Sequence, residues 1–172
     1  MQRSQESDEA RKWVLVVSNS SVIIALAKIC YLYLLEKLFG EILVPEAVWK
    51  EITVEGKPGY EKIVRAKFIS LKKVGDTRLV ALLEEFIDTG EAEAIALALE
   101  RGADLLLVDD RDARNLAKRL GLQVMGTLGV IALAKYEGLV PKAKPIIDRL
   151  IESGFWISRN ILEEFLKELD EL

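Results

Sequence analysis

The sequence feature that most constrains the fold is a short apolar run, Leu105–Val108, that stops at two adjacent aspartates, Asp109 and Asp110. A continuous apolar run of this length is typical of a parallel strand that other elements cover on both faces. The segment before it, Ala92–Leu99, is apolar on nearly every side and predicts a helix buried against a sheet. In open α/β sheets ligands bind at the carboxyl ends of the strands, so the two aspartates stand where a functional site is expected.

Similar apolar strands alternate with helical spacing along the rest of the chain. They are expected at Val14–Val17, Ile42–Val44, Phe68–Leu71 and Gln123–Met125. This alternation predicts a parallel sheet with right-handed crossovers, and hence a three-layer α/β/α domain. With 172 residues, of which 51% are hydrophobic, the chain has enough apolar material for one core. We therefore expect a single domain over residues 12–172, preceded by a short polar, disordered leader at residues 1–11.

The composition excludes several classes of active site. The chain has no histidine, so Ser-His-Asp triads, Cys-His pairs and ordinary zinc sites are impossible. Its one cysteine, Cys30, cannot form an internal disulfide, and its apolar neighbours predict a buried thiol in a protein of the reducing cytosol. The most apolar window, Val22–Leu35, is too short for a membrane span and contains Lys28. We therefore expect a soluble, cytoplasmic protein that does not bind a membrane.

Carboxylates are the groups that remain for catalysis. Several are expected near the carboxyl ends of strands, namely Glu51, Glu91, Glu93, Asp109 and Asp110, with Asp112 close behind. Carboxylates gathered in one crevice repel one another unless a cation neutralises them, and oxygen ligands select hard ions such as Mg²⁺ or Mn²⁺. Such an ion can deprotonate water and stabilise a phosphoryl oxygen. The chain has no Walker loop and no Gly-x-Gly-x-x-Gly after a strand, which disfavours a nucleotide-binding fold.

The candidates also have ordinary structural interpretations. The segment from Asp88 to Glu91 matches an N-terminal capping box, in which the two side chains pair with backbone N–H groups. Asp110 can cap the helix that follows it, and Asn19 taken alone would be interpreted as a helix cap. Spacing alone does not choose between capping and catalysis for any of these residues.

Five short motifs mark the predicted strand ends and helix starts. They are Ser-Asn-Ser-Ser at Ser18–Ser21, Val-Pro-x-x-Val-x-x-Glu at Val44–Glu51, Gly-Glu-x-Glu-Ala-Ile at Gly90–Ile95, Leu-Leu-Val-Asp-Asp at Leu106–Asp110 and Gly-Thr-Leu-Gly at Gly126–Gly129. Together they resemble the PIN domain, the metal-dependent nuclease fold shared by the toxin ribonucleases of Vap-type toxin–antitoxin pairs. The resemblance covers residues 13–158, and the last two motifs are most similar to a prokaryotic PIN-like branch that is frequent in archaea.

The resemblance implies a sheet order of 3-2-1-4-5 and a site for Mg²⁺ or Mn²⁺. The family's metal ligands correspond to Asn19, Glu91, Asp109 and Asp110, and its catalytic residues to these four together with Glu51. The reaction that it implies is metal-assisted hydrolysis of an RNA phosphodiester by water. It also implies an antitoxin protein as a partner.

Asn19 departs from the family pattern, because the first strand of a PIN domain ends in an aspartate. An amide keeps one oxygen for coordination but loses a full negative charge, so metal affinity and water activation should both fall. The sequence therefore leaves two expectations open: a weakened or inactive relative, or a nuclease into which the asparagine was introduced to silence it.

Two other functions remain open. One is a PIN-like module that binds RNA or an antitoxin peptide without cutting, and the other is a scaffold whose apolar helices, such as Val22–Leu35, form a homodimer. The net charge of −4 gives no global basic field, so RNA would have to meet a local group of cations. Candidate phosphate contacts are Arg111, Arg114, Lys118 and Arg119, although a solvated helix face is the more ordinary interpretation of most of them.

Overall fold

Five parallel strands form one sheet in the order β3-β2-β1-β4-β5. They are β1 (Val16–Ser18), β2 (Ile42–Val44), β3 (Ile69–Leu71), β4 (Leu105–Leu107) and β5 (Val124–Met125). This is the predicted order, with β1 and β4 adjacent and Ser18 opposite Leu107. The computed structural model describes residues 15–172, so the leader expected at residues 1–11 lies outside the described residues. The single domain expected over residues 12–172 stays a prediction.

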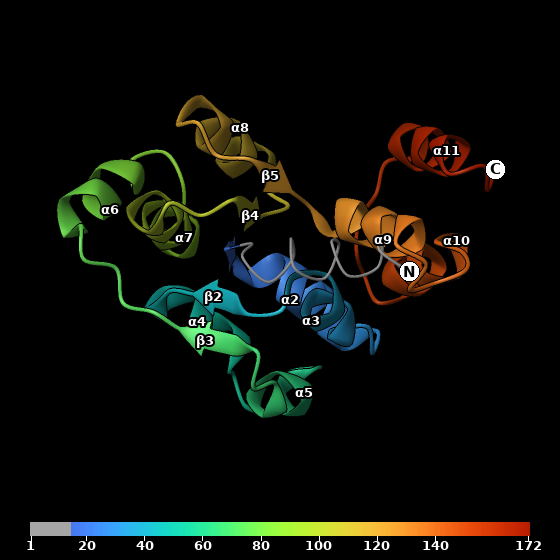
Figure 1. Ribbon diagram of the computed structural model, residues 1–172, viewed down its shortest axis with the longest axis horizontal. Coiled ribbons are helices and arrows are strands. Elements are labelled where there is room, and N and C mark those ends of the chain that lie inside the picture. Colours follow the sequence, from blue (N-terminus) through green and yellow to red (C-terminus); the bar gives the residue numbers. More distant parts are fainter. Residues whose placement is uncertain (1–14) are drawn as a thin grey trace, which may run out of the picture.

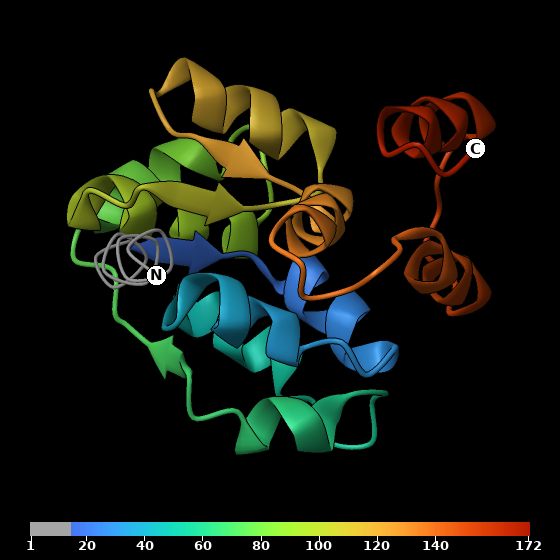
Figure 2. The same ribbon diagram turned by 45° about the vertical axis from the view of Figure 1, so that its right-hand side comes forward.

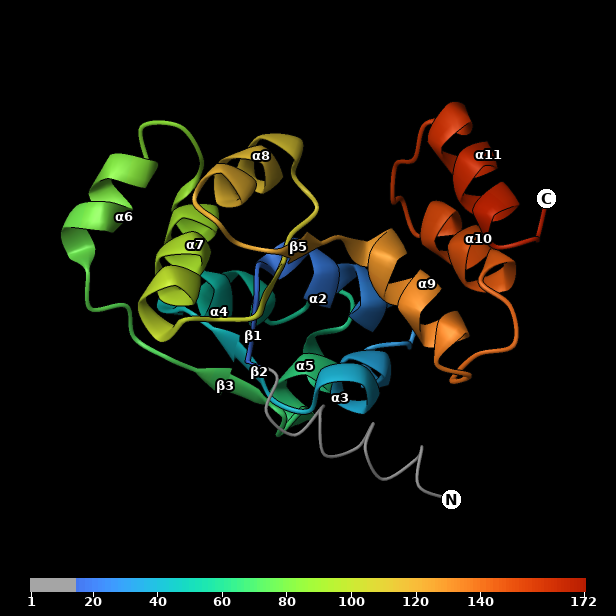
Figure 3. The same ribbon diagram turned by 45° about the horizontal axis from the view of Figure 1, so that its top comes forward.

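Helices flank the sheet on both faces, as Figures 1 and 3 show, which confirms the three-layer α/β/α arrangement. They are α2 (Ser20–Lys28), α3 (Tyr33–Phe39), α4 (Glu46–Ile52), α5 (Tyr60–Arg65), α6 (Thr77–Leu83), α7 (Thr89–Arg101), α8 (Arg111–Arg119), α9 (Thr127–Tyr136), α10 (Lys144–Glu152) and α11 (Arg159–Glu168). The helix α7 packs against β1, β4 and α4, so it covers the middle of the sheet. Within residues 15–172, no helix is long and apolar enough to cross a membrane.

The core lies between the sheet and the helices on either side of it. Both β1 and β2 are buried along their whole length, because side chains on both faces of the sheet meet helices. The expected burial of α7 is confirmed, with nearly all of its first ten residues shielded from solvent. The side chains of Val22, Leu26, Leu34 and Leu35 are also fully buried. The helices proposed above for a homodimer interface therefore bury these side chains in the chain's own core.

The expected burial of Cys30 is wrong, because its side chain is exposed. The helix α2 ends at Lys28, and the chain then reverses. The backbone N–H of Cys30 donates to the Ala27 carbonyl at 3.2 Å, and that of Tyr31 donates to the Leu26 carbonyl at 2.9 Å. Cys30 has a φ of +67°, in the left-handed region that often ends a helix. This reversal turns the side chain outward despite its apolar neighbours in sequence.

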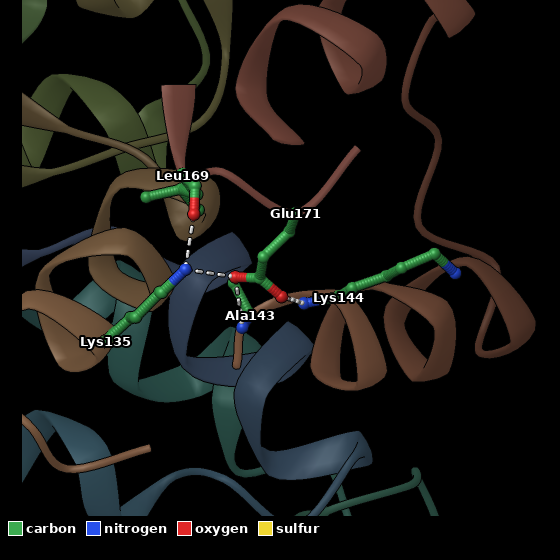
Figure 4. Close-up of polar contacts among 5 residues, drawn as sticks. All are labelled: Lys135, Ala143, Lys144, Leu169 and Glu171. Atoms are coloured by element: carbon green, nitrogen blue, oxygen red, sulfur yellow. Dashed lines mark hydrogen bonds and ion pairs between the residues drawn. The ribbon is translucent and has the colours of Figure 1, made fainter. Parts of the chain in front are cut away.

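The last residues of the chain contact α9 and the start of α10, and Figure 2 shows the C-terminal helices α10 and α11 at one end of the molecule. The carboxylate of Glu171 accepts hydrogen bonds from the backbone N–H groups of Ala143 at 2.9 Å and Lys144 at 3.0 Å. It also pairs with Lys135 Nζ at 2.8 Å, and the same nitrogen donates to the Leu169 carbonyl at 2.5 Å (Figure 4). One buried carboxylate thus joins α9, the start of α10 and the end of the chain.

Candidate active site

Asn19 continues the pairing between β1 and β4. Its backbone N–H donates to the Leu107 carbonyl at 2.8 Å, which places it beside Val108, the residue before Asp109. Asn19 stands at the N-cap position of α2, but its side chain accepts no hydrogen bond from that helix. Its Oδ1 atom, like the Ser21 hydroxyl oxygen, is buried and has no hydrogen-bond partner within the described residues. A buried, unpartnered oxygen of this kind is available to a cation or a water molecule.

Glu51 reaches the same strand end from α4. Ser20 Oγ donates to Glu51 Oε2 at 2.6 Å, so the first residue of α2 holds this carboxylate. The other oxygen, Oε1, lies over Gly90 in the first turn of α7. A Cβ at Gly90 would overlap Oε1 and lie 3.2 Å from the carboxyl carbon of Glu51. The missing side chain at Gly90 therefore lets the carboxylate of Glu51 reach the start of α7.

Glu91 is the most perturbed acid of the group. It forms the predicted capping box, because its backbone N–H donates to Asp88 Oδ1 at 2.8 Å and its Oε2 accepts from the Asp88 N–H at 3.3 Å. Burial raises the pKa of Glu91 to about 7. The negative charges of Asp88 and Asp110, and to a smaller degree that of Glu51, act in the same direction, whereas the hydrogen bond from the Asp88 N–H lowers the pKa. Acids from α4, α7 and the end of β4 therefore share one electrostatic environment.

The two aspartates after β4 point to different helices. Asp110 is exposed and caps α8, with Oδ2 accepting from the Ala113 N–H at 2.9 Å. Asp109 binds Thr127 at the start of α9, accepting at 2.7 Å from its backbone N–H and at 2.7 Å from its hydroxyl. A carboxylate has about four lone-pair sites, so Asp109 keeps some coordinating capacity while Thr127 fixes its orientation.

Two further acids singled out in the sequence are not drawn into this group. Glu93 Oε2 accepts from the Ala47 N–H at 2.7 Å, so it caps α4 and joins that helix to α7. Asp112 lines a separate cavity on the outer side of α8. Sequence reasoning missed the contact between Thr127 and Asp109, although the Gly-Thr-Leu-Gly motif contained its signal. A Cβ at Gly126 would lie 2.8 Å from Asp109 Oδ1, so this glycine makes room for the contact.

A family model described as a PIN domain matches residues 15–171 of this chain. The chain belongs to the PIN domain family. No curated protein matches the sequence. PIN domains are generally divalent-metal-dependent, and the family supports a nuclease-like module that acts on RNA.

The residues of this PIN domain fit an oxygen-ligated divalent cation. The buried Asn19 Oδ1 atom lacks a partner, and the pKa of Glu91 is raised by burial and by the charges of neighbouring acids. Within residues 15–172, no three acidic side chains already surround one metal position. Mg²⁺ commonly uses only one or two carboxylates, with water and substrate phosphate completing its shell. A site of two carboxylates and one amide oxygen is therefore chemically adequate for a weakly held hard cation.

The helix α8, which begins directly after Asp110, carries four cations. One terminal nitrogen of Arg114 would be 3.3 Å from a Cβ at Gly126, which puts its guanidinium close to Asp109. Arg111, Lys118 and Arg119 are exposed on α8. None of these four cations forms a salt bridge with another side chain in the described part of the chain. Their charges are available to phosphate groups that approach α8.

Proposed function

We propose that this PIN domain is a divalent-metal-dependent endoribonuclease whose activity is weakened by Asn19. The observation that supports the proposal is the grouping at the carboxyl ends of β1 and β4. There the buried carboxylate of Glu91 shares its electrostatic environment with Glu51 and Asp110, and the Asn19 Oδ1 atom at the end of β1 is buried without a partner. Carboxylate and amide oxygens of this kind are ligands of hard cations, and a bound cation would offset the repulsion among the acids.

The side chains divide the work of hydrolysis. Asn19, Glu91 and Asp110 would hold Mg²⁺ or Mn²⁺, with Asp109 as a further ligand that Thr127 keeps in place. When bound there, such an ion would supply a lowered pKa for water and a positive charge for the phosphoryl oxygens. Glu51, held by Ser20, would orient the attacking water and accept its proton. The cations of α8 would hold the phosphates on either side of the cut bond.

Asn19→Asp tests the proposal directly. The extra carboxylate should tighten Mn²⁺ binding and increase cleavage of a mixed RNA pool together, because both depend on the charge of one site. Without metal, the new charge should lower the melting temperature slightly, and Mn²⁺ should reverse that loss by binding only the folded state. Cleavage is measured on gels, and the metal-induced rise in melting temperature by calorimetry.

The matched control is Asn160→Asp on α11, which adds the same charge at an exposed position away from the acids. It should change neither cleavage nor the response to Mn²⁺. If Asn19→Asp behaves like this control, Asn19 does not belong to the active site and the nuclease proposal fails.

We propose, on the resemblance to Vap-type proteins, that the nuclease is the toxin of a toxin–antitoxin pair. Expression of Asn19→Asp in a bacterial host should then arrest growth, and Glu91→Gln in the same chain should relieve the arrest. Normal growth with the active variant would contradict a toxin role. The antitoxin would be sought as a protein that restores growth and binds the chain.

A non-cleaving RNA-binding module is the second candidate. The capping contacts of Asp109 and Asp110 favour it, since both aspartates already serve the helices that follow them. It predicts that RNA binds without Mn²⁺ and remains intact with it, in the natural chain and in Asn19→Asp alike. The cleavage assay above therefore distinguishes the two functions. A homodimer stays a prediction that sedimentation analysis tests.

A further inference from the structure

Arg114 differs from the other three cations of α8 in its exposure. It is half-buried, whereas the other three are exposed. It follows Ala113 directly and stands one turn before Ala117, and both alanines are fully buried. Arg114 therefore lies at the edge of the face that α8 packs against the protein, and Figure 1 shows this helix beside β5. The other cations have no such anchoring.

The side chain of Arg114 reaches the start of α9, near the end of β4. Long side chains of a helix point back toward its N-terminus, and α8 begins directly after Asp110. A Cβ at Gly126, the N-cap of α9, would lie 3.3 Å from Arg114 Nη1 and 2.8 Å from Asp109 Oδ1. The guanidinium and the carboxylate of Asp109 therefore border the same small space, which the missing side chain of Gly126 leaves open. This observation connects Arg114 to the acids that follow β4.

The guanidinium of Arg114 has no partner among residues 15–172. It forms neither a hydrogen bond nor a salt bridge with another group of the described chain. Asp109 uses its two carboxylate oxygens for Thr127 instead. A guanidinium carries five N–H donors in a planar fork that matches the oxygens of a phosphate. The fork of Arg114 is therefore available to a phosphate that reaches the site.

The charge of Arg114 also has a purely structural interpretation. Asp109 and Asp110 precede α8 and Asp112 lies in its first turn, and a cation among acids offsets their mutual repulsion. Neutralisation requires a positive charge but no particular shape, whereas a contact with phosphate uses the planar fork. Arg114→Lys separates the two interpretations, because lysine keeps the charge and loses the fork.

We propose that Arg114 contacts the phosphoryl group that is cut, with two N–H groups donating to its non-bridging oxygens. The inference rests on the proposed ribonuclease function and assigns one cation of α8 to the reacting phosphate. In the reaction, the oxygen of water bonds to phosphorus while the bond from phosphorus to the leaving sugar oxygen breaks. One proton of the water passes to Glu51, and the leaving oxygen takes a proton from solvent. Arg114 stabilises the negative charge of the non-bridging oxygens in the transition state.

The first test is the rate of cleavage of a labelled RNA decamer at saturating protein, with Mn²⁺. It uses the Asn19→Asp chain, which is expected to be the more active form. Adding Arg114→Ala should lower this rate by about 100- to 1,000-fold, as for the loss of one donor that stabilises a transition state. Arg114→Lys should recover only a small part of the loss, because it lacks the fork. Added guanidinium ions should raise the rate of the Arg114→Ala chain but not that of its parent.

The second test needs no cleavage. Binding of the same RNA to the natural chain is measured by fluorescence anisotropy in EDTA at several salt concentrations. Arg114→Ala should lower the slope of log affinity against log salt by about 1, as expected for one lost phosphate contact. Arg65→Ala removes an exposed arginine from α5 and is the matched control, which should change neither the slope nor the cleavage rate. Melting temperatures show whether the variants stay folded.

An unchanged slope in Arg114→Ala would overturn the proposal, and so would an unchanged cleavage rate. Full activity of Arg114→Lys would also overturn it, because a positive charge alone would then suffice. A loss of cleavage that accompanies a lower melting temperature, and that guanidinium ions do not restore, would make Arg114 a structural residue and overturn it too. The nuclease proposal fails separately. If Asn19→Asp cuts no RNA while Arg114→Ala lowers the slope, the phosphate contact stands and the nuclease does not.

Discussion

The carboxylate of Glu91 combines two roles that conflict when the site holds no cation. As part of the capping box it stabilises the start of α7 by accepting the Asp88 N–H. As a buried acid near Asp88, Asp110 and Glu51 it is penalised when it ionises, and its pKa rises to about 7. A bound cation removes the second effect and leaves the first. Metal binding and proton release should therefore be coupled at this residue.

Glu91→Gln separates the two roles, because an amide oxygen still accepts the Asp88 N–H while the charge is lost. The folded pKa is above the unfolded value of 4.5, so the folded state binds the proton more tightly and stability falls as the pH rises from 4.5 to about 7. At pH 8 without metal, Glu91→Gln should be more stable by about 1 kcal/mol, because the variant avoids burying a charge and its repulsion by the nearby acids, part of which solvent screens. At pH 4 the difference should vanish.

Denaturant melts at the two pH values measure this difference, with Glu164→Gln at an exposed position of α11 as the control. Mn²⁺ should stabilise the natural chain more than Glu91→Gln, because the variant lacks one ligand charge. A loss of stability at pH 8 in Glu91→Gln would mean that the capping bond outweighs the repulsion, and that Glu91 is a structural acid.

At the scale of elements, the parallel sheet and its covering helices were predictable because short apolar strands and their intervening helices are local patterns, whereas the strand order came from the resemblance to the family. The capping box was predictable for the same reason, since Asp88 and Glu91 are three residues apart. The contact between Asp109 and Thr127 was not, because it joins residues 18 positions apart and depends on where α9 begins relative to β4. Cys30 was misjudged because a chain reversal, and not its neighbours in sequence, decides its exposure.

The contact between Asp109 and Thr127 joins the end of β4 to the start of α9, so its removal should loosen that junction. Thr127→Val keeps the backbone N–H but deletes the hydroxyl that donates to Asp109 Oδ2. Because Thr127 is fully buried, the lost hydrogen bond should lower stability by about 1–2 kcal/mol. Thr89→Val, at an exposed position of α7, is the matched control and should have little effect.

The double variant with Asp109→Ala shows whether the two side chains act through each other. Once Asp109 is absent, the Thr127 hydroxyl loses its partner, so Thr127→Val should cost less in that background than in the natural chain. The measurement is the free energy of unfolding of the four proteins in denaturant. Strictly additive losses would show that Thr127 does not hold Asp109.

At the scale of the whole molecule, α9 connects the candidate site to the end of the chain. Its first residue, Thr127, holds Asp109, and Lys135 near its other end pairs with Glu171. Glu171 also caps α10 through the N–H groups of Ala143 and Lys144, residues 28 and 27 positions earlier in the chain (Figure 4). The last residues therefore fasten the C-terminal helices to a helix whose other end orients a candidate metal ligand.

Glu171→Gln should show how much this fastening contributes. Burial alone would raise the pKa of Glu171. The hydrogen bonds from Lys135, Lys144 and Ala143 and the charge of Lys135 outweigh this effect, so the pKa falls from 4.5 to about 2. Since the folded pKa is below the unfolded 4.5, the ionised carboxylate adds stability that is present above pH 4.5 and is lost as the pH falls through about 2. At pH 7 the variant should lose about 1–2 kcal/mol, and the deficit should shrink toward pH 2.

Acid titrations of the natural chain, Glu171→Gln and the exposed control Glu168→Gln, each followed by circular dichroism, measure this deficit. The stabilities of the natural chain and Glu171→Gln should converge toward pH 2, because the other carboxylates titrate equally in all three proteins. Glu168→Gln should match the natural chain at every pH. If Glu171→Gln were less stable than the natural chain by the same amount at pH 7 and pH 2, the packing of the side chain, and not its charge, would hold the end of the chain. Cleavage by Asn19→Asp should survive Glu171→Gln at temperatures where both proteins stay folded, since Thr127 and Asp109 keep their own contact.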